Sequence, residues 1–325
     1  MAEIASGPEA IAEAVRRLLG GRLVAFPTET VYGLGADALS AEAVEKVFAL
    51  KGRPAGNPLI VHVAGVEMAR AVTADWPEAA GRIADAFWPG PVTIVLPKGD
   101  CVPDAVTAGG PTVAVRCPAH PCALALIEAV GRPIVGPSAN PSGFISPTTP
   151  EHVHDAFADE DLLVIDGGHC RAGIESTVVD LTTGTPRILR PGIVGPHAIA
   201  KALGRSVEAL DSDPRTDRAR SPGVIGAHYQ PRTTTRLIKS SDLERAPSSA
   251  ILVAWSVGAH PSGGTLIAMP ETIGAYAAAM YRALHEADRS PGTEIWVEPP
   301  PEGASEDDRA IREAVMERLG RAAHA

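Results

Sequence analysis

Along residues 1–204, hydrophobic positions switch repeatedly between helical and strand-like spacing. Behind Ser6 and Glu9, which have the spacing of a capping box, residues 11–19 follow helical spacing and predict a first helix. The apolar run 23–26 then predicts a buried strand. Further helices are expected after Ser40, around Met68 and Ile83, over 121–130, after Thr149 and near 196–203, and further strands over 59–63, 92–96, 112–115, 133–136, 162–166, 176–181 and 187–190. Short strands interleaved with helices without regular alternation indicate an α/β domain built on a twisted mixed sheet.

The pattern breaks over residues 205–236, where Asp, Ser, Pro and Gly accumulate, and this segment is expected to be a linker. A second pattern follows over residues 237–325. It predicts strands at 250–255, 264–268 and 293–297 and helices near 271–287 and 305–319. Residues 237–325 are therefore expected to form a smaller α/β domain of Rossmann-like type, although they hold no glycine-rich nucleotide loop.

The overall charge argues against a protein that holds nucleic acid by charge alone. The 325 residues carry 39 acidic and 29 basic side chains, a formal charge of −10, whereas neutralising phosphates requires an excess of cations. Four scattered cysteines do not suggest a disulfide framework. The sequence shows neither a secretory signal nor an apolar run long enough to cross a bilayer, so a cytoplasmic protein without membrane association is expected.

One segment of this acidic chain is locally basic. Between residues 214 and 239, Asp217 is the single acid, and the cations are Arg215, Arg218, Arg220, Arg232, Arg236 and Lys239. A solvated linker explains such a run of charge, and so does a segment that lies over a site for an anionic ligand. The sequence leaves both interpretations open.

Common catalytic signatures are absent from the sequence, including the phosphate-binding loop, the HExxH zinc helix and the nucleophile elbow. Cys117, His120 and Cys122 lie close together, but their spacing fits no usual zinc site and better suits a loop at the start of a helix. His152 and His154 stand at the head of a predicted helix and are expected at the surface.

Three polar clusters follow predicted elements and are candidates for a ligand site. The first is 27–35, where threonine hydroxyls accompany two glycines, and the second is 51–57, where Lys51 and Arg53 could clamp an anion. The third, 136–143, offers small hydroxyl and amide groups in a loop constrained by Gly and Pro. Each cluster alone is explained at least as well as a structural turn or a helix end, and for 27–35 the structural turn is the better explanation.

Taken together and in order, the motifs resemble the YrdC-like family. They are FPTETVYGLG (26–35), KGRP (51–54) with NPLIVH (57–62), FWPGPVT (87–93), VRCP (115–118), PSAN (137–140), STVVD (176–180) and RPG (190–192). The resemblance covers residues 10–200 nearly continuously. With SPG (221–223), His228, Tyr229 and the additional C-terminal domain, the chain looks like the longer, two-domain L-threonylcarbamoyladenylate synthases of that family.

The resemblance implies a twisted open sheet with a deep, positively charged cavity. It also implies condensation of L-threonine, bicarbonate and ATP into L-threonylcarbamoyladenylate with release of pyrophosphate. A downstream transferase complex would then move the threonylcarbamoyl group to the tRNA adenosine next to the anticodon, so binding of tRNA by this chain is expected to be weak or indirect. The alternative is an RNA-binding or regulatory YrdC-like protein without synthase activity.

By matching motifs, the resemblance also implies site residues. Lys51 and Arg53 would be catalytic and hold the phosphates of ATP. The remaining ATP contacts would be Asn57, Thr112, Ser138, Asn140, Ser146, Arg190 and Tyr229, and the threonine contacts Thr30, His62, Arg116, Ser138 and Ser176. Which of Ser138 and Asn140 faces ATP and which faces threonine stays open. Mg²⁺ would accompany ATP, and no residue is assigned to it.

The sequence departs from the family pattern at one point. The family often has a Lys or Arg between its Ser-Pro-Gly and His-Tyr motifs, whereas here residues 224–227 are uncharged. Arg220 or Arg232 could replace that cation.

Overall fold

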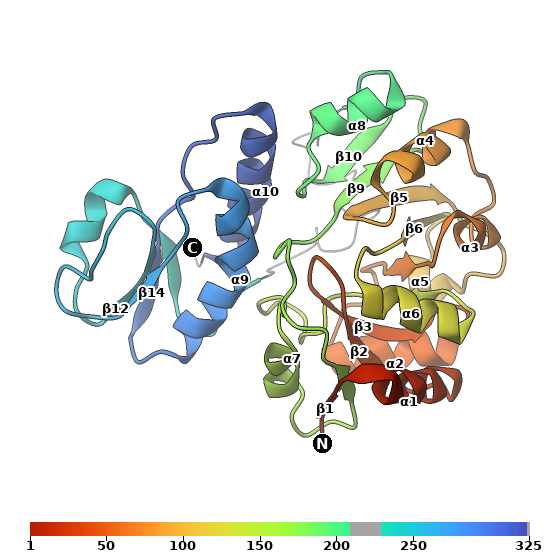
Figure 1. The fold of residues 1–325 in the computed structure, drawn as a ribbon, viewed down its shortest axis with the longest axis horizontal. Helices are drawn as coiled ribbons and strands as arrows, with labels where there is room; N and C mark the ends of the chain where they lie inside the picture. The colour runs from red at the N-terminus through yellow and green to blue at the C-terminus, as the bar shows by residue number, and fades with distance from the viewer. Residues whose placement is uncertain (209–228, 324–325) are drawn as a thin grey trace.

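The computed structural model describes residues 1–208 and 229–323, and its described helices and strands form two α/β domains (Figure 1). The first domain is built on a ten-stranded sheet in the order β1-β8-β2-β3-β7-β4-β6-β5-β9-β10. Its strands are β1 (Glu3–Ala5), β2 (Val24–Pro27), β3 (Tyr32–Asp37), β4 (Ile60–His62), β5 (Val92–Pro97), β6 (Thr112–Arg116), β7 (Ile134–Val135), β8 (Leu163–Ile165), β9 (Thr177–Asp180) and β10 (Arg187–Arg190). Parallel and antiparallel pairs alternate irregularly, which confirms the predicted mixed sheet.

Helices cover the sheet of the first domain. They are α1 (Gly7–Leu19), α2 (Ala41–Lys51), α3 (Val66–Ala71), α4 (Glu78–Phe87), α5 (Asp104–Thr107), α6 (Pro121–Val130), α7 (Pro150–Ala156) and α8 (Pro196–Leu203). The predicted capping box of α1 does not form, because the Ser6 side chain accepts no capping bond. In α2, the Ser40 hydroxyl accepts from the Ala43 amide, and Gly52 ends the helix in the left-handed conformation at φ 58°.

Strand β3 occupies part of what the sequence predicts as a polar turn. Gly33 and Gly35 hide the strand pattern, yet both face the buried ring of Phe26. A Cβ atom on Gly33 would lie 3.0 Å from Phe26 Cζ, so glycine allows β3 to pair closely with β2. The threonines of the FPTETVYGLG motif are thereby held in a rigid β2–β3 connection.

The second domain has a four-stranded parallel sheet in the order β11-β14-β12-β13. Its elements are β11 (Thr235–Leu237), the 3₁₀ helix η2 (Ser240–Arg245), β12 (Ala250–Ala254), β13 (Leu266–Ala268), α9 (Ile273–Arg289), β14 (Glu294–Val297) and α10 (Glu306–Ala322). The parallel sheet agrees with the predicted Rossmann-like domain. β11 already belongs to this sheet at Thr235, two residues before the expected boundary at 237.

Helices α9 and α10 lie between the C-terminal sheet and the first domain (Figure 1). One apolar cluster joins Ile145 and Ile174 of the first domain to Tyr281 and Leu284 of α9. Near the start of the predicted linker, Glu208 forms a β-bridge with Arg187 at the edge of the first sheet. Most of the predicted linker, residues 209–228, lies outside the described residues. Among the described helices, none is both long and apolar enough to cross a bilayer.

Candidate active site

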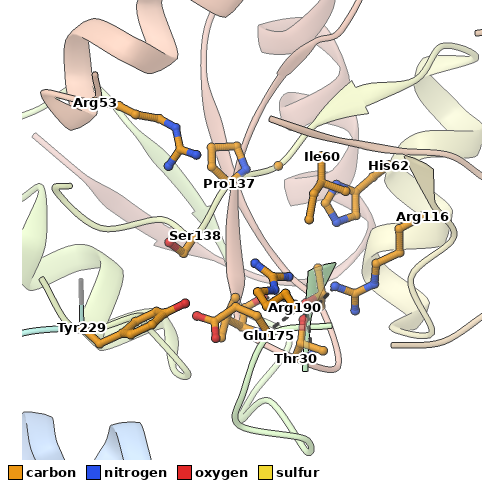
Figure 2. Close-up of a pocket in the computed structure, with 13 residues that line it drawn as sticks. Thr30, Arg53, Ile60, His62, Arg116, Pro137, Ser138, Glu175, Arg190 and Tyr229 are labelled. Atoms are coloured by element: carbon orange, nitrogen blue, oxygen red, sulfur yellow. Dashed lines mark hydrogen bonds between the residues drawn. The ribbon is translucent and has the colours of Figure 1, made fainter. Parts of the chain in front are cut away.

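A cavity of about 520 Å³, measured with its opening to solvent, lies where the polar clusters of the sequence meet (Figure 2). Its walls come from the β2–β3 connection, the end of α2, strands β4, β6 and β10, and the loops after β7 and before β9. The lining residues are Thr28, Thr30, Val31, Arg53, Ile60, His62, Arg116, Gly136, Pro137, Ser138, Glu175, Arg190 and Tyr229. Three of them are arginines, and Glu175 is the one acid on the described walls.

Arg53 is held rigidly beside the end of α2. Its Nε donates to the Asn57 carbonyl at 3.1 Å and its Nη2 donates to the Pro58 carbonyl at 2.9 Å. Burial lowers the pKa of Arg53 to about 10, so the guanidinium is still charged at neutral pH. Two backbone carbonyls therefore orient a charged donor whose side chain points into the cavity (Figure 2).

Arg116 ends β6 and lies among three oxygens. Its Nη1 donates to Thr30 Oγ1 at 3.0 Å and its Nε donates to the Gly90 carbonyl at 3.2 Å. Its Nη2 lies 2.6 Å from Glu29 Oε1, an ion pair outside hydrogen-bond geometry. Glu29 also accepts from the Ala119 amide. This buried arrangement presents a guanidinium and a hydroxyl side by side.

His62 stands on β4 with its ring edge-on to Phe26, the ring centroids 5.7 Å apart. Burial, and then the nearby Arg116, lowers the pKa of His62 to about 3, so the imidazole is neutral. Its Nδ1 is buried and has no hydrogen-bond partner. A Cβ atom on Gly136 would lie 2.7 Å from this nitrogen, so glycine keeps the space open. An orphaned polar atom at an open wall is typical of a ligand contact.

Arg190, at the end of β10, is oriented by Ser176. Its Nε donates to the Ser176 carbonyl at 3.1 Å and its Nη2 donates to Ser176 Oγ at 3.0 Å. Ser176 Oγ also lies 2.7 Å from Thr93 Oγ1. Ser176 is fully buried and stands behind Arg190, outside the cavity lining.

Both domains match known family models. Residues 16–192 match the family model of Sua5, YciO and YrdC proteins, which carries the description telomere recombination. Residues 194–324 match the model described as the C-terminal domain of threonylcarbamoyl-AMP synthase. The chain belongs to the Sua5/YciO/YrdC family.

The chain is similar over most of its length to relatives of this family. It is 41% identical over 313 residues to a threonylcarbamoyl-AMP synthase of Pyrococcus abyssi, which covers 93% of this chain and 90% of the relative. It is 45% identical over 203 residues to the threonylcarbamoyl-AMP synthase of Bacillus subtilis, covering 62% of this chain and 59% of the relative. The crystal structure of P. abyssi Sua5 with L-threonine matches with a TM-score of 0.89 at 37% identity, over 99% of this chain and 97% of that one.

Lys51 is buried behind the cavity wall, although motif matching predicts that it contacts the phosphates of ATP. Its Nζ donates to the backbone carbonyls of Ser138 and Asn140. Lys51 is absent from the described lining, whereas Ser138 is part of it. In this structure Lys51 fixes the loop after β7, and a direct contact with ATP stays a prediction.

We expect Lys51→Met to destabilise the fold, because the Asn140 carbonyl loses its donor and the Ser138 carbonyl keeps only the Asn140 amide. The orphaned Asn140 carbonyl costs about 1–3 kcal/mol, and the loop that carries Ser138 loosens. Lys46→Met is the matched control, since Lys46 lies on the same helix but pairs with exposed Glu42. Urea denaturation measures the difference. Equal midpoints in the two variants would contradict the assigned role of Lys51.

Several other predicted ATP contacts stand outside the described cavity lining. The Ser146 hydroxyl is fully buried and donates to Glu175 Oε1 at 2.7 Å. The Asn140 amide donates to the carbonyls of Pro141 and Phe144, which shapes its own loop. Thr112 begins β6, at the opposite end of the strand from Arg116. The direct roles of Ser146, Asn140 and Thr112 toward ATP stay predictions.

Of the other predicted ATP contacts, Tyr229 lines the cavity and Asn57 lies beside Arg53. The buried Asn57 Oδ1 has no hydrogen-bond partner, and the Asn57 carbonyl holds Arg53. Tyr229 lines the cavity in a positive-φ conformation at 66° and packs against Tyr281 at 5.5 Å between ring centroids. Glu175, which motif matching did not single out, lies directly before STVVD, but two of its partners, Tyr281 and Arg318, are more than 100 residues away in sequence.

His120, His152 and His154 lie outside the described lining of the cavity. His120 is the N-cap of α6, and its Nδ1 accepts from the Cys122 amide, which confirms the interpretation as a loop at a helix start. His154 is exposed, but the expected surface position of His152 is wrong. His152 is buried against His285 of α9, with the ring centroids 3.8 Å apart. The domain interface, invisible in the local helix pattern, covers it.

The stacked histidines line a second cavity, which also receives Arg232. The Arg232 guanidinium lies 5.9 Å from the centre of the Phe144 ring, and the Arg232 amide donates to Asp288. Arg232 is therefore placed at the second cavity and is not part of the described lining of the first. Arg220, the other candidate for the missing linker cation, lies outside the described residues.

Stability is expected to fall in acid because His152 and His285 are neutral in the folded protein. Burial, reinforced by His285, lowers the pKa of His152 to about 2, and burial lowers that of His285 to about 4. An unfolded histidine titrates near pH 6.5, so below that pH the unfolded state binds more protons and is favoured. Each histidine then removes about 1.4 kcal/mol per pH unit.

His285→Phe keeps a stacked ring without the titration. We expect its unfolding free energy to decline less between pH 7 and pH 5 than that of the unmodified protein, by roughly 1–2 kcal/mol. His154→Asn is the control, because His154 is exposed. Urea denaturation at both pH values is the measurement. Parallel declines in all three proteins would show that the stacked pair does not control acid stability.

Proposed function

We propose that this chain is a threonylcarbamoyl-AMP synthase. It condenses L-threonine, bicarbonate and ATP into L-threonylcarbamoyl-AMP and releases pyrophosphate. The observation that carries the proposal is the cavity in which Arg53, Arg116 and Arg190 converge, in a chain related over nearly its whole length to a synthase of that name.

The threonine end of the cavity is assigned to Arg116, Thr30 and His62. Arg116 offers charged donors to a carboxylate, and Thr30 fixes the orientation of its guanidinium. The neutral imidazole of His62 offers a hydrogen bond without adding a charge next to the threonine amine. P. abyssi Sua5, which this chain resembles, has been solved with L-threonine.

The ATP end is assigned to Arg53, Arg190, Ser138 and Tyr229. The threonine amine first adds to bicarbonate with loss of water, and a carbamate oxygen then bonds to the α-phosphorus as the bond to the β-phosphate oxygen breaks. Two anions must approach each other, so fixed donors that neutralise charge and align the reactants lower the barrier. Arginine, serine, threonine and asparagine side chains supply such donors without titrating near neutral pH.

Mg²⁺ is proposed to enter with ATP, where it would neutralise part of the phosphate charge. Glu175, the one acid on the described cavity walls, already accepts from three side chains, so it does not fit as a free metal ligand. No residue is assigned to the metal. A threonylcarbamoyl-transferase complex that acts on the tRNA adenosine next to the anticodon is the proposed consumer of the product.

The decisive experiment incubates the purified protein with ATP, L-threonine and labelled bicarbonate and follows pyrophosphate. Release that depends on both threonine and bicarbonate is expected. Equal release without threonine would make the proposed substrate wrong. The competing function, RNA binding without synthesis, predicts a salt-dependent tRNA gel shift and no pyrophosphate; the charge of −10 argues against it.

A further inference from the structure

Glu175 connects the reaction cavity to both helices at the domain interface. Its Oε1 accepts from Ser146 Oγ at 2.7 Å, and its Oε2 accepts from Arg318 Nε at 3.2 Å. The hydroxyl of Tyr281 lies 3.2 Å from Oε1 and 3.0 Å from Oε2. One carboxylate on the cavity wall is thus held by the first domain, by α9 and by α10.

Arg318 is fully buried, so its ion pair with Glu175 is shielded from water. Its Nη1 donates to the Pro191 carbonyl at 2.7 Å, beside Arg190, and to the Ala314 carbonyl at 3.1 Å. A guanidinium removed from water is costly unless carboxylates and carbonyls surround it, and its field is weakly screened. Arg318 therefore acts strongly on groups next to it.

The backbone before Glu175 is fitted against α9. Gly173 has a positive φ of 72°, and a Cβ atom there would lie 2.5 Å from Ala278 Cα and 2.6 Å from the Ala277 carbonyl. Only a residue without a side chain permits this approach. The loop that carries Glu175 is consequently set by the C-terminal domain through its backbone as well as its side chain.

Glu175 in turn borders the groups assigned to ATP. The next residue, Ser176, binds the guanidinium of Arg190 through its carbonyl and its hydroxyl. On the other side, the ring of Tyr229 packs against Tyr281. Figure 2 shows Glu175 between Tyr229 and Arg190 at the edge of the cavity.

We propose that Arg318 and Tyr281 are positioning residues for the reaction, acting through Glu175 to fix the ATP side of the cavity. The C-terminal domain is then a part of the active site that touches no substrate. This inference rests on the proposed synthase function. It assigns to the second domain a role that its own fold, which has no glycine-rich nucleotide loop, does not reveal.

The charge state of Glu175 makes the inference testable. Burial alone raises the pKa of this carboxyl, but Arg318, then Arg190 and the hydrogen bond from Ser146, bring the pKa down to about 2. The other titratable groups around this centre are Tyr229, Tyr281 and Glu317. Glu175 is therefore ionised throughout the working pH range, and its titration does not shape the activity of the unmodified protein.

Arg318→Met should change that behaviour. With the guanidinium gone, burial raises the pKa of Glu175, so the carboxylate is lost as the pH falls through the raised value. We expect kcat/KM for ATP to drop about 10²-fold, the KM for threonine to change less than about twofold, and a new acid limb to enter the pH profile. Arg318→Lys should recover part of the loss, and Glu175→Gln should be impaired without the acid limb.

Arg312→Met is the matched control, because Arg312 is also on α10 but pairs with exposed Glu302 within its own domain. Its kinetics should equal those of the unmodified protein. Should Arg318→Met fail to fold, Tyr281→Phe removes one hydroxyl and should lower kcat/KM for ATP in the same direction. Fluorescence-monitored urea denaturation identifies the folded variants.

The inference is overturned if Arg318→Met and Arg312→Met share the same ATP kinetics and pH profile. It is also overturned if kcat/KM for ATP and kcat/KM for threonine fall equally and no acid limb enters the pH profile. Loosened packing alone would cause such an equal loss. Equilibrium dialysis with ATP separates this failure from that of the proposed function. If the unmodified protein releases no pyrophosphate, the synthase function is wrong. The positioning role is then tested separately: it predicts weaker ATP binding by Arg318→Met than by the unmodified protein.

Discussion

Arg53→Ala is expected to abolish threonine-dependent pyrophosphate release, with a fall in kcat of about 10³-fold. The Asn57 and Pro58 carbonyls fix the Arg53 guanidinium at the cavity wall, so its donors are preorganised for charge that develops on the transferring phosphate. Pyrophosphate release with ATP, threonine and bicarbonate is the measurement. The overall fold should survive, which circular dichroism checks.

Arg53→Lys separates charge from geometry at the same position. Lysine keeps a cation but loses the planar fork that meets two carbonyls and, as proposed, a phosphate together, so most of the activity should still be lost. Arg82→Ala is a suitable control, because Arg82 pairs with exposed Glu78 on α4. Retained turnover in a folded Arg53→Ala protein would refute the assigned role.

Arg116→Met is expected to raise the KM for threonine by about 10²-fold or more, because the carboxylate of the amino acid loses its charged partner. The same change leaves Glu29 buried without the guanidinium 2.6 Å away, which destabilises the protein by about 3–5 kcal/mol. Initial rates at varied threonine and fixed ATP measure the first effect, and urea denaturation measures the second.

The double variant Glu29→Gln/Arg116→Met distinguishes the two effects. Removing the stranded charge should restore much of the stability, while threonine binding should stay weak. A double variant that regains normal KM for threonine would show that Arg116 acts only by balancing Glu29. In that case the threonine carboxylate would have to bind elsewhere in the cavity.

Sequence periodicity located most of the secondary structure because amphipathic helices and apolar strands bury one face each. The failures have physical causes. β3 contains Gly33 and Gly35, which pack against Phe26 without contributing apolar side chains of their own. β1 spans Glu3–Ala5 at the sheet edge beside β8, and its exposed Glu3 and Ile4 give no alternating signal.

Several residues that motif matching singled out face one cavity, and their contacts with substrates stay predictions. The described structure brings Thr30, Arg53, His62, Arg116, Ser138, Arg190 and Tyr229 onto one wall system, as motif matching implied. Motif matching does not distinguish a residue that touches a ligand from one that supports it. Lys51 and Ser176 are buried behind the residues they orient in this structure, and their direct contacts with ligands stay predictions.

The contribution of the C-terminal domain was not predictable from local patterns. Arg318 resembles any other cation on the charged helix α10, and only the tertiary fold brings it to Glu175. His152 was misplaced for the same reason, because its burial depends on His285 from α9. Contacts between distant segments follow from topology, which single-sequence periodicity does not encode.

The contact between Glu175 and Arg318 joins positions 143 residues apart, which has a consequence for how the protein matures. Contacts between segments this far apart in sequence form later than local hairpins and helices, because their loop-closure entropy must be paid first. Before the two domains dock, Glu175 lacks the bonds from Tyr281 and Arg318 and keeps only its first-domain partner Ser146. On the positioning role proposed for Arg318, nucleotide binding therefore depends on docking of the two domains.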